Sequence, residues 1–155
     1  MAETSAGILL YRRSAGQWQV LLAHPGGPFW RRRDEGAWTI PKGVVHQNEE
    51  PEAAARREFA EELGVAASGP LRPLGEIRQR SGKRVIAFAL QGEFEPDRLH
   101  SNEFAVEWPP KSGRTSSFPE IDRADWFALP VARKKILGGQ SPLLDRLEDM
   151  LSQRR

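Results

Sequence analysis

The sequence predicts an α/β fold in which helices cover a mixed β-sheet, and three observations lead to this fold class. Stretches typical of strands and of helices follow one another without the strict alternation of an all-parallel sheet. The 155 residues have the length of one ordinary domain, which we expect to span residues 1–155. The hydrophobic fraction of 39% and the charged fraction of 28% are those of a globular chain.

Apolar runs and turn-forming residues predict the elements at the start of the chain. Ser5–Arg12 and Gln17–Ala23 are predicted strands, and they flank the turn sequence Ser14-Ala15-Gly16. The stretch His24–Gly36 is rich in proline and glycine and is expected to be a loop. A short extended piece is expected next, at Trp38–Ile40.

The middle of the chain is expected to hold a helix and a β-hairpin. The helix is predicted over Pro51–Leu63, because proline suits the first helical position and Gly64 suits the left-handed residue that closes a helix. The hairpin is predicted from Leu74–Arg80 and Lys83–Gly92, with its turn at Ser81-Gly82.

The last third is expected to contain a loop, a strand and two helices. Proline, glycine and serine residues predict a loop over Trp108–Phe118, and Ile121–Leu129 is a predicted strand. Val131–Leu137 and Pro142–Ser152 are the predicted helices, and Ser141 is expected to be the N-cap of the second one.

Composition excludes several kinds of site and partner. The chain has no cysteine, which excludes disulfides, thiolate zinc sites and a cysteine nucleophile. The apolar run Ala6–Tyr11 is too short to span a membrane and lacks signal-peptide flanks, so we expect a cytoplasmic protein that needs no membrane. A net charge of only +2 predicts no stable nucleic-acid partner. His24, His46 and His100 are scattered, which argues against a histidine metal site.

One acidic segment, residues 43–65, carries six glutamates against two arginines. At about 100° per residue, the side chains of Glu58, Glu61 and Glu62 lie on one edge of the predicted helix, within about 100° of one another. Three unpaired carboxylates on one edge repel one another unless a hard divalent cation binds them. The alternative is a solvated helix face whose glutamates pair in part with Arg56 and Arg57.

The order of residues in this segment favours a cation site over a solvated helix face. It matches the signature G-x5-E-x7-R-E-U-x-E-E-x-G-U, where U is a bulky apolar residue. The matching residues are Gly43, Glu49, Arg57, Glu58, Phe59, Glu61, Glu62, Gly64 and Val65. Phe59 departs from the commoner aliphatic residue, which concerns packing and not chemistry. With this signature and the preceding Trp-x-x-Pro-Lys-Gly at residues 38–43, the chain resembles the Nudix hydrolases.

The resemblance implies a fold, an activity and a set of roles. The fold is an α/β/α sandwich, and the activity is hydrolysis of a nucleoside diphosphate linked to another group X. Glu58, Glu61 and Glu62 would hold Mg²⁺ or Mn²⁺, with the Gly43 carbonyl as a further ligand. Arg57 would hold a signature glutamate in place, and Glu49, the fourth glutamate of the signature, would support the metal ligands.

The reaction also needs a base and cations that bind phosphates. Glu58 is one candidate base, and three carboxylates outside the signature are others: Glu103, Glu107 and Glu120. We favour Glu120, because it precedes the predicted strand that contains Trp126. The cations expected to bind phosphates are Lys42, Lys111 and Arg114, and the run Arg31–Arg33 is an alternative. Three aromatic residues either stack on a base or pack within the protein: Trp30, Phe104 and Phe118.

The substrate is less sharply defined than the reaction. A nucleoside triphosphate or a dinucleoside polyphosphate is favoured by the lead-in to the signature, although the tyrosine that often follows it in dinucleoside polyphosphate enzymes is missing. A diphosphoinositol polyphosphate or a capped RNA end is an alternative substrate. A second class of function is a catalytically idle module that binds nucleotide or RNA, which the four intact signature glutamates argue against.

Overall fold

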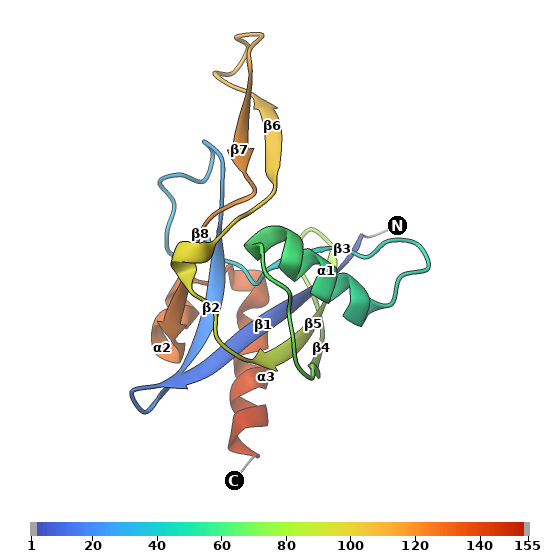
Figure 1. Ribbon diagram of the computed structural model, residues 1–155, viewed down its shortest axis with the longest axis vertical. Helices are drawn as coiled ribbons and strands as arrows, with labels where there is room; N and C mark the ends of the chain where they lie inside the picture. Colours follow the sequence, from blue (N-terminus) through green and yellow to red (C-terminus); the bar gives the residue numbers. More distant parts are fainter. Residues whose placement is uncertain (1–2, 154–155) are drawn as a thin grey trace.

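The computed structural model describes residues 3–153, and its centre is a mixed β-sheet (Figure 1). The strands of this sheet are β1 (Thr4–Ser14), β2 (Gln17–Pro25), β3 (Lys42–Val44), β4 (Arg72–Arg78), β5 (Arg84–Gln91) and β8 (Ile121–Ala128). They are ordered β4-β5-β1-β2-β8, and β3 pairs with the N-terminal part of β1. The β1–β5 pairing is parallel and the others are antiparallel, which confirms the predicted mixed sheet.

Helices pack against both faces of the sheet. Their bounds are α1 (Pro51–Leu63), α2 (Leu129–Lys135) and α3 (Ser141–Ser152), with short 3₁₀ turns at η1 (Pro96–Arg98) and η2 (Gly138–Gln140). Alternate residues of β1 enter two separate cores: Ile8 packs in the core that contains α1, and Leu9 packs in the core that contains α2 and α3. This is the α/β/α arrangement that the sequence resemblance implies.

The helix α1 has the bounds that its sequence predicts. Pro51 is its first residue, and Gly64 closes it in the left-handed conformation with a φ of 83°. The Gly64 N–H donates to the Ala60 carbonyl at 2.8 Å. A side chain at Gly64 would come within 2.7 Å of the His100 carbonyl oxygen, so glycine is required here both for its φ and for space.

The two C-terminal helices begin earlier than predicted. α2 starts at Leu129, because Pro130 occupies its first turn, where a missing N–H costs nothing. Ser141 lies inside α3 and is not its cap, so that prediction is wrong. The preceding residue, Gln140, is fully buried and its side chain accepts a hydrogen bond from the Ile40 N–H at 3.0 Å.

A two-stranded hairpin projects from the sandwich, at the top of Figure 1. Its strands are β6 (Glu103–Glu107) and β7 (Thr115–Pro119), so the loop predicted over Trp108–Phe118 is limited to the tip. The threonine and serines that precede Phe118 are typical of a loop, which hid the strand β7 from sequence analysis. Phe104 and Phe118 are cross-strand partners with ring centroids 6.3 Å apart.

Within residues 3–153, the helices are too short or too polar to cross a lipid bilayer.

Candidate active site

The strand β3 lies directly against the C-terminal half of α1. The Lys42 backbone N–H donates to Glu62 Oε2 at 2.9 Å. At the next residue, Gly43, a β-carbon would overlap the carboxylate of Glu58. We call Glu58, Glu61 and Glu62 the carboxylate cluster. Because residue 43 is a glycine, the backbone of β3 can lie directly against two of them, Glu58 and Glu62.

Arg57 connects the cluster to the segment before α1. Its guanidinium donates to both carboxylate oxygens of Glu49, at 2.9 and 3.0 Å, and to the Val44 carbonyl at 2.9 Å. It also donates to Glu58 Oε1 at 2.7 Å and lies 3.3 Å from Glu61 Oε2. Arg57 therefore pairs with Glu58 and Glu61, so these two carboxylates are not unpaired, although three carboxylates share its single positive charge.

The carboxylates of this network differ strongly in their tendency to hold a proton. Burial raises the pKa of Glu62 to about 8, and the negative charge of Glu58 acts in the same direction. The hydrogen bonds from Arg57, together with one from the His46 backbone N–H, lower the pKa of Glu49 to about 2. Glu49 is thus ionised at neutral pH and holds Arg57 in place. Glu62 retains its proton near neutral pH unless a positive charge lies beside it.

The donor atoms of the cluster suit a hard divalent cation. Carboxylate oxygens are the ligands that Mg²⁺ and Mn²⁺ prefer, and the missing side chain of Gly43 leaves the Glu58 carboxylate directly against the backbone of β3. As the side chains stand, no three histidine, aspartate or glutamate groups of residues 3–153 converge on one point. Arg57 supplies the positive charge between Glu58 and Glu61 in this arrangement.

Glu120 lies in the bend between β7 and β8, at the base of the projecting hairpin. Its backbone is fixed on both sides, because its N–H donates to the Asn102 carbonyl and its carbonyl accepts from the Gly26 N–H, each at 2.8 Å. Partial burial raises the pKa of the Glu120 carboxyl, and the negative charges of Glu58 and Glu61 raise it further. The fold therefore brings this distant glutamate into the electrostatic field of the cluster.

The other candidate bases are less well placed. The Glu107 carboxylate accepts the backbone N–H groups of Lys111 and Gly113, at 3.0 and 3.2 Å, and so holds the turn at the hairpin tip. Glu103 is the first residue of β6 and is exposed.

The predicted phosphate-binding cations are divided between two places. Lys42 is at the cluster, where burial lowers the pKa of its ammonium group and the charge of Glu62 opposes this effect. Lys111 and Arg114 are exposed at the hairpin tip. The five-residue strand β6 separates the tip from the hairpin base by about 17 Å, so the fold does not bring these two cations to the carboxylates.

The aromatic and histidine residues singled out in the sequence have structural partners. Phe104 and Phe118 pack on each other, and the Arg33 guanidinium lies 5.4 Å from the Trp30 ring centroid. His24 is fully buried between Asp122 and the Arg33 carbonyl. Sequence reasoning missed the Val44 carbonyl and the His46 N–H, because backbone groups leave no signal in a residue pattern.

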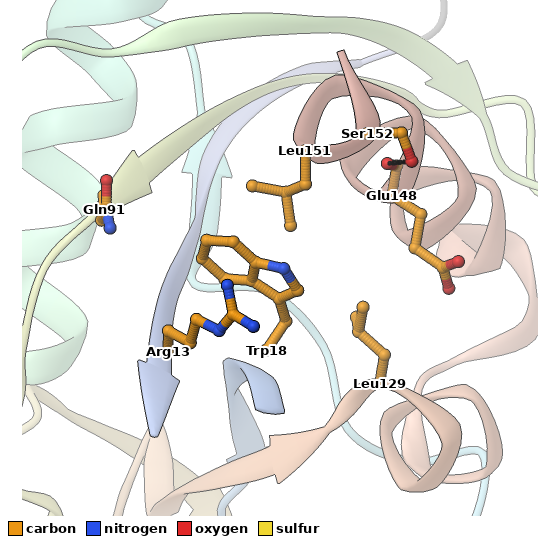
Figure 2. A pocket seen from close by; sticks show the side chains of 7 residues that line it. All are labelled: Arg13, Trp18, Gln91, Leu129, Glu148, Leu151 and Ser152. Carbon is orange, nitrogen blue, oxygen red and sulfur yellow. Dashed lines mark hydrogen bonds between the residues drawn. The ribbon is translucent and has the colours of Figure 1, made fainter. Parts of the chain in front are cut away.

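A separate cavity of about 720 Å³ belongs to the core of α2 and α3, away from the cluster (Figure 2). It is lined by Arg13, Trp18, Gln91, Leu129, Glu148, Leu151 and Ser152. In Figure 2 the Arg13 side chain lies over the Trp18 ring, with a guanidinium-to-centroid distance of 5.4 Å. None of the carboxylate cluster residues lines this cavity.

Curated relatives match parts of this chain. An octanoyltransferase of Myxococcus xanthus is 32% identical over 108 residues, which are 68% of this chain and 27% of that protein. RNA pyrophosphohydrolases of Alkalilimnicola ehrlichii and Caulobacter vibrioides are 35% identical over 105 residues and 45% identical over 53 residues. The matches cover 54% and 31% of this chain, and 58% and 31% of those proteins. The chain thus spans less than two thirds of the length of these relatives.

Solved structures and the NUDIX domain profile match nearly the whole chain. A C. elegans Ap4A hydrolase binary complex has a TM-score of 0.67 at 22% identity, covering 96% of this chain and 98% of that one. The NUDIX domain of Shewanella oneidensis NrtR, solved with ADP ribose, has a TM-score of 0.68 at 16% identity, covering 97% and 89%. At these identities the likeness shows the fold. Residues 1–147 match the profile of the NUDIX domain, and the chain therefore belongs to the Nudix family.

Proposed function

We propose that this Nudix domain is a metal-dependent pyrophosphohydrolase that cleaves a nucleoside diphosphate linked to another group. The observation that carries the proposal is the joint placement of Glu58, Glu61 and Glu62 beside Gly43, with Arg57 and Glu49 fixing two of the carboxylates. An idle binding module has no need for three carboxylates on one helix edge, one of them buried and two held by the same arginine. The relatives named RNA pyrophosphohydrolase support the same class of reaction.

The cluster would hold Mg²⁺ or Mn²⁺. Such an ion, when bound, would neutralise the negative charge of the pyrophosphate and lower the pKa of a bound water. Glu62 would contribute a buried carboxyl that gives up its proton when it becomes a metal ligand. Arg57 orients Glu58 and Glu61, and Glu49 in turn orients Arg57. Such supporting contacts are typically worth 10- to 100-fold in metal affinity or activity.

Glu120 is the proposed general base. Two observations support this role: partial burial and the negative charges of Glu58 and Glu61 raise its pKa, which would make it a better proton acceptor than an ordinary glutamate, and its backbone is fixed by hydrogen bonds to Asn102 and Gly26. It would take the proton from the attacking water while that water approaches phosphorus in line.

The proposed substrate is a nucleoside triphosphate or a dinucleoside polyphosphate. The fold shared with the Ap4A hydrolase of C. elegans supports this class. Lys42 at the cluster would bind the phosphates nearest the reaction, and Lys111 and Arg114 would contact the far end of a long ligand. The 5′ end of RNA is a second candidate, favoured by the two RNA pyrophosphohydrolase relatives.

A substrate panel tests the proposal. Nucleoside triphosphates, dinucleoside polyphosphates, ADP-ribose and 5′-triphosphorylated RNA are incubated with Mg²⁺ or Mn²⁺, and the products are separated. We expect hydrolysis of at least one of them in the presence of the metal and none with a chelator. Reaction in water labelled with ¹⁸O is expected to place the label on a phosphate product. Absence of metal-dependent turnover across the panel would refute the proposal.

A further inference from the structure

A second pocket, of about 390 Å³, lies where the loop after β2 meets the tip of the β6–β7 hairpin. It is lined by Pro28, Phe29, Arg31, Arg32, Arg33 and Trp108. We propose that this pocket, which we call the arginine pocket, binds single-stranded oligonucleotides, with an unpaired base on its aromatic rings and phosphates on its guanidinium groups. This site is separate from the carboxylate cluster and goes beyond the proposed hydrolysis. It departs from the expectation of no stable nucleic-acid partner, because a net charge of +2 does not reveal three arginines gathered at one pocket.

The aromatic wall of the pocket comes from two segments that are far apart in the sequence. Phe29 and Trp108 meet edge to face, with ring centroids 5.6 Å apart and planes at 84°. Phe29 is nevertheless 59% exposed, so it contributes little to a core. A ring that is fixed by a neighbour and open to solvent offers a face on which any base can stack.

The three consecutive arginines supply the positive charge. Arg31, Arg32 and Arg33 are all exposed. The acid that follows them, Asp34, is already bound by the Lys135 ammonium group and the Trp38 indole N–H. Within residues 3–153 no carboxylate forms an ion pair with Arg31, Arg32 or Arg33, and the Arg33 guanidinium lies over the Trp30 ring. The planar donors of these side chains suit phosphate oxygens.

The loop that carries the arginines is anchored to the sandwich. His24 is fully buried, and its two ring nitrogens lie 2.7 Å from Asp122 Oδ1 and 2.6 Å from the Arg33 carbonyl oxygen. The Arg33 N–H donates to the Trp30 carbonyl at 2.9 Å. Because the backbone at Arg33 is held in place before any ligand arrives, binding costs less ordering.

The distance between the two sites sets the length of the ligand. Figure 1 shows the hairpin rising from the sandwich with the loop after β2 beside it. The contact between Phe29 and Trp108, the residue after β6, joins the loop to the hairpin. The strand β6 places Trp108 about 17 Å from the hairpin base, where Glu120 lies. At about 3.4 Å per nucleotide, roughly five stacked nucleotides span this distance. A strand of about this length would reach from Trp108 to the hairpin base, which a mononucleotide would not.

Binding is measured by fluorescence anisotropy at 100 mM salt with a chelator present, so that no hydrolysis occurs. The probes are a labelled ten-nucleotide RNA, the DNA of the same sequence, and the corresponding duplex. The variant Arg31→Gln/Arg32→Gln/Arg33→Gln is compared with Arg72→Gln/Arg78→Gln/Arg80→Gln, which removes the same charge on and after β4, the edge strand opposite β8. We expect the first variant to lose at least tenfold in affinity for a single strand and the second to lose less than threefold.

The aromatic contact is tested separately with Phe29→Ala and Phe29→Tyr. We expect Phe29→Ala to weaken single-strand binding about tenfold and Phe29→Tyr to keep it, because tyrosine preserves the stacking face. Tighter binding of RNA than of DNA, or the reverse, identifies the natural strand. Equal losses in the two arginine variants, no loss in Phe29→Ala, or duplex binding as tight as single-strand binding would each overturn the proposal.

These measurements are independent of the proposed hydrolysis. If the strand binds and no nucleotide is cleaved, the arginine pocket stands and the hydrolase assignment fails. If short nucleotides are cleaved and the strand does not bind, the opposite holds.

Discussion

Arg57 makes contact with Glu49, Glu58, Glu61 and the Val44 carbonyl. One side chain thus links the segment before α1 to the carboxylates on the helix. A lysine in its place would keep the charge but has no planar fork with which to donate to several acceptors in fixed directions. The organisation of the site therefore depends on the guanidinium shape as well as on its charge.

Replacement of Arg57 by methionine is expected to lower the metal-dependent kcat by about 10- to 100-fold, because Glu58 and Glu61 lose the donor that orients them. Arg57→Lys is expected to recover only part of this loss. The matched control is Arg56→Met, the neighbouring arginine, which donates to the carbonyls of Ala67 and Gly69 instead. The measurement is kcat from steady-state kinetics on the best substrate. Equal losses of kcat in the two methionine variants would contradict the role of Arg57 in orienting Glu58 and Glu61.

Glu62 makes the metal-free protein sensitive to pH. Its pKa is about 8 in the folded state, whereas an ordinary glutamate loses its proton near 4.5. Between these two values the folded state binds more protons than the unfolded state, so the free energy of unfolding falls as pH rises. The expected loss is on the order of a few kcal/mol across this window.

The measurement is urea denaturation in chelator at several pH values between 4.5 and 8. Glu62→Gln cannot ionise and is expected to show a flatter profile than the wild type, while Glu52→Gln, an exposed glutamate of the same helix, is expected to follow the wild type. Parallel profiles for wild type and Glu62→Gln would mean that burial does not control this carboxyl.

At the scale of elements, α1 is the part of the fold that depends most on local sequence. Its proline, its closing glycine and its glutamates were all identifiable from residue types and spacing, and its bounds agree with the prediction. The β6–β7 hairpin was not identifiable in full, because its partner strands bury little and its polar residues resemble a loop. The hairpin therefore depends on the pairing of β6 with β7, which the local residue pattern does not reveal.

Gly64→Ala is expected to destabilise the protein by at least about 2 kcal/mol, because alanine is strained at a φ of 83° and its β-carbon meets the His100 carbonyl. Gly82→Ala is the matched control. It has a similar φ of 91° but nothing within 4 Å of the new atom, so only the strain of about 1 kcal/mol remains. Urea midpoints at constant m-value measure both, and equal losses would show that the His100 segment moves away freely.

At the scale of the whole molecule, the sheet brings distant residues to one edge of α1. Glu120 lies 58 positions after Glu62 in the chain, and the residue after it begins β8, whose pairing with β2 brings Glu120 close enough for the charges of Glu58 and Glu61 to add to the effect of burial in raising its pKa. Sequence reasoning chose Glu120 from its position before a strand, and it had no means of excluding Glu107, whose carboxylate proves to hold the hairpin tip. The joint placement of Glu58, Glu61 and Glu62 was predictable because their spacing within one helix fixes their geometry, whereas Gly43 and Glu49 were identified by their match to the Nudix signature. Phe29 and Trp108 were not, because only the fold brings the β2 loop to the hairpin.

The central claim is that the cluster on α1 performs metal-dependent hydrolysis, and the most direct test is the Mg²⁺-dependent turnover of Glu61→Gln. This substitution keeps the shape of the side chain and removes one charge from the cluster. We predict a loss of about 10³-fold in kcat with an unchanged fold, and a near wild-type rate for Glu52→Gln, an exposed glutamate of the same helix. Turnover by Glu61→Gln as fast as that of the wild type would contradict the account.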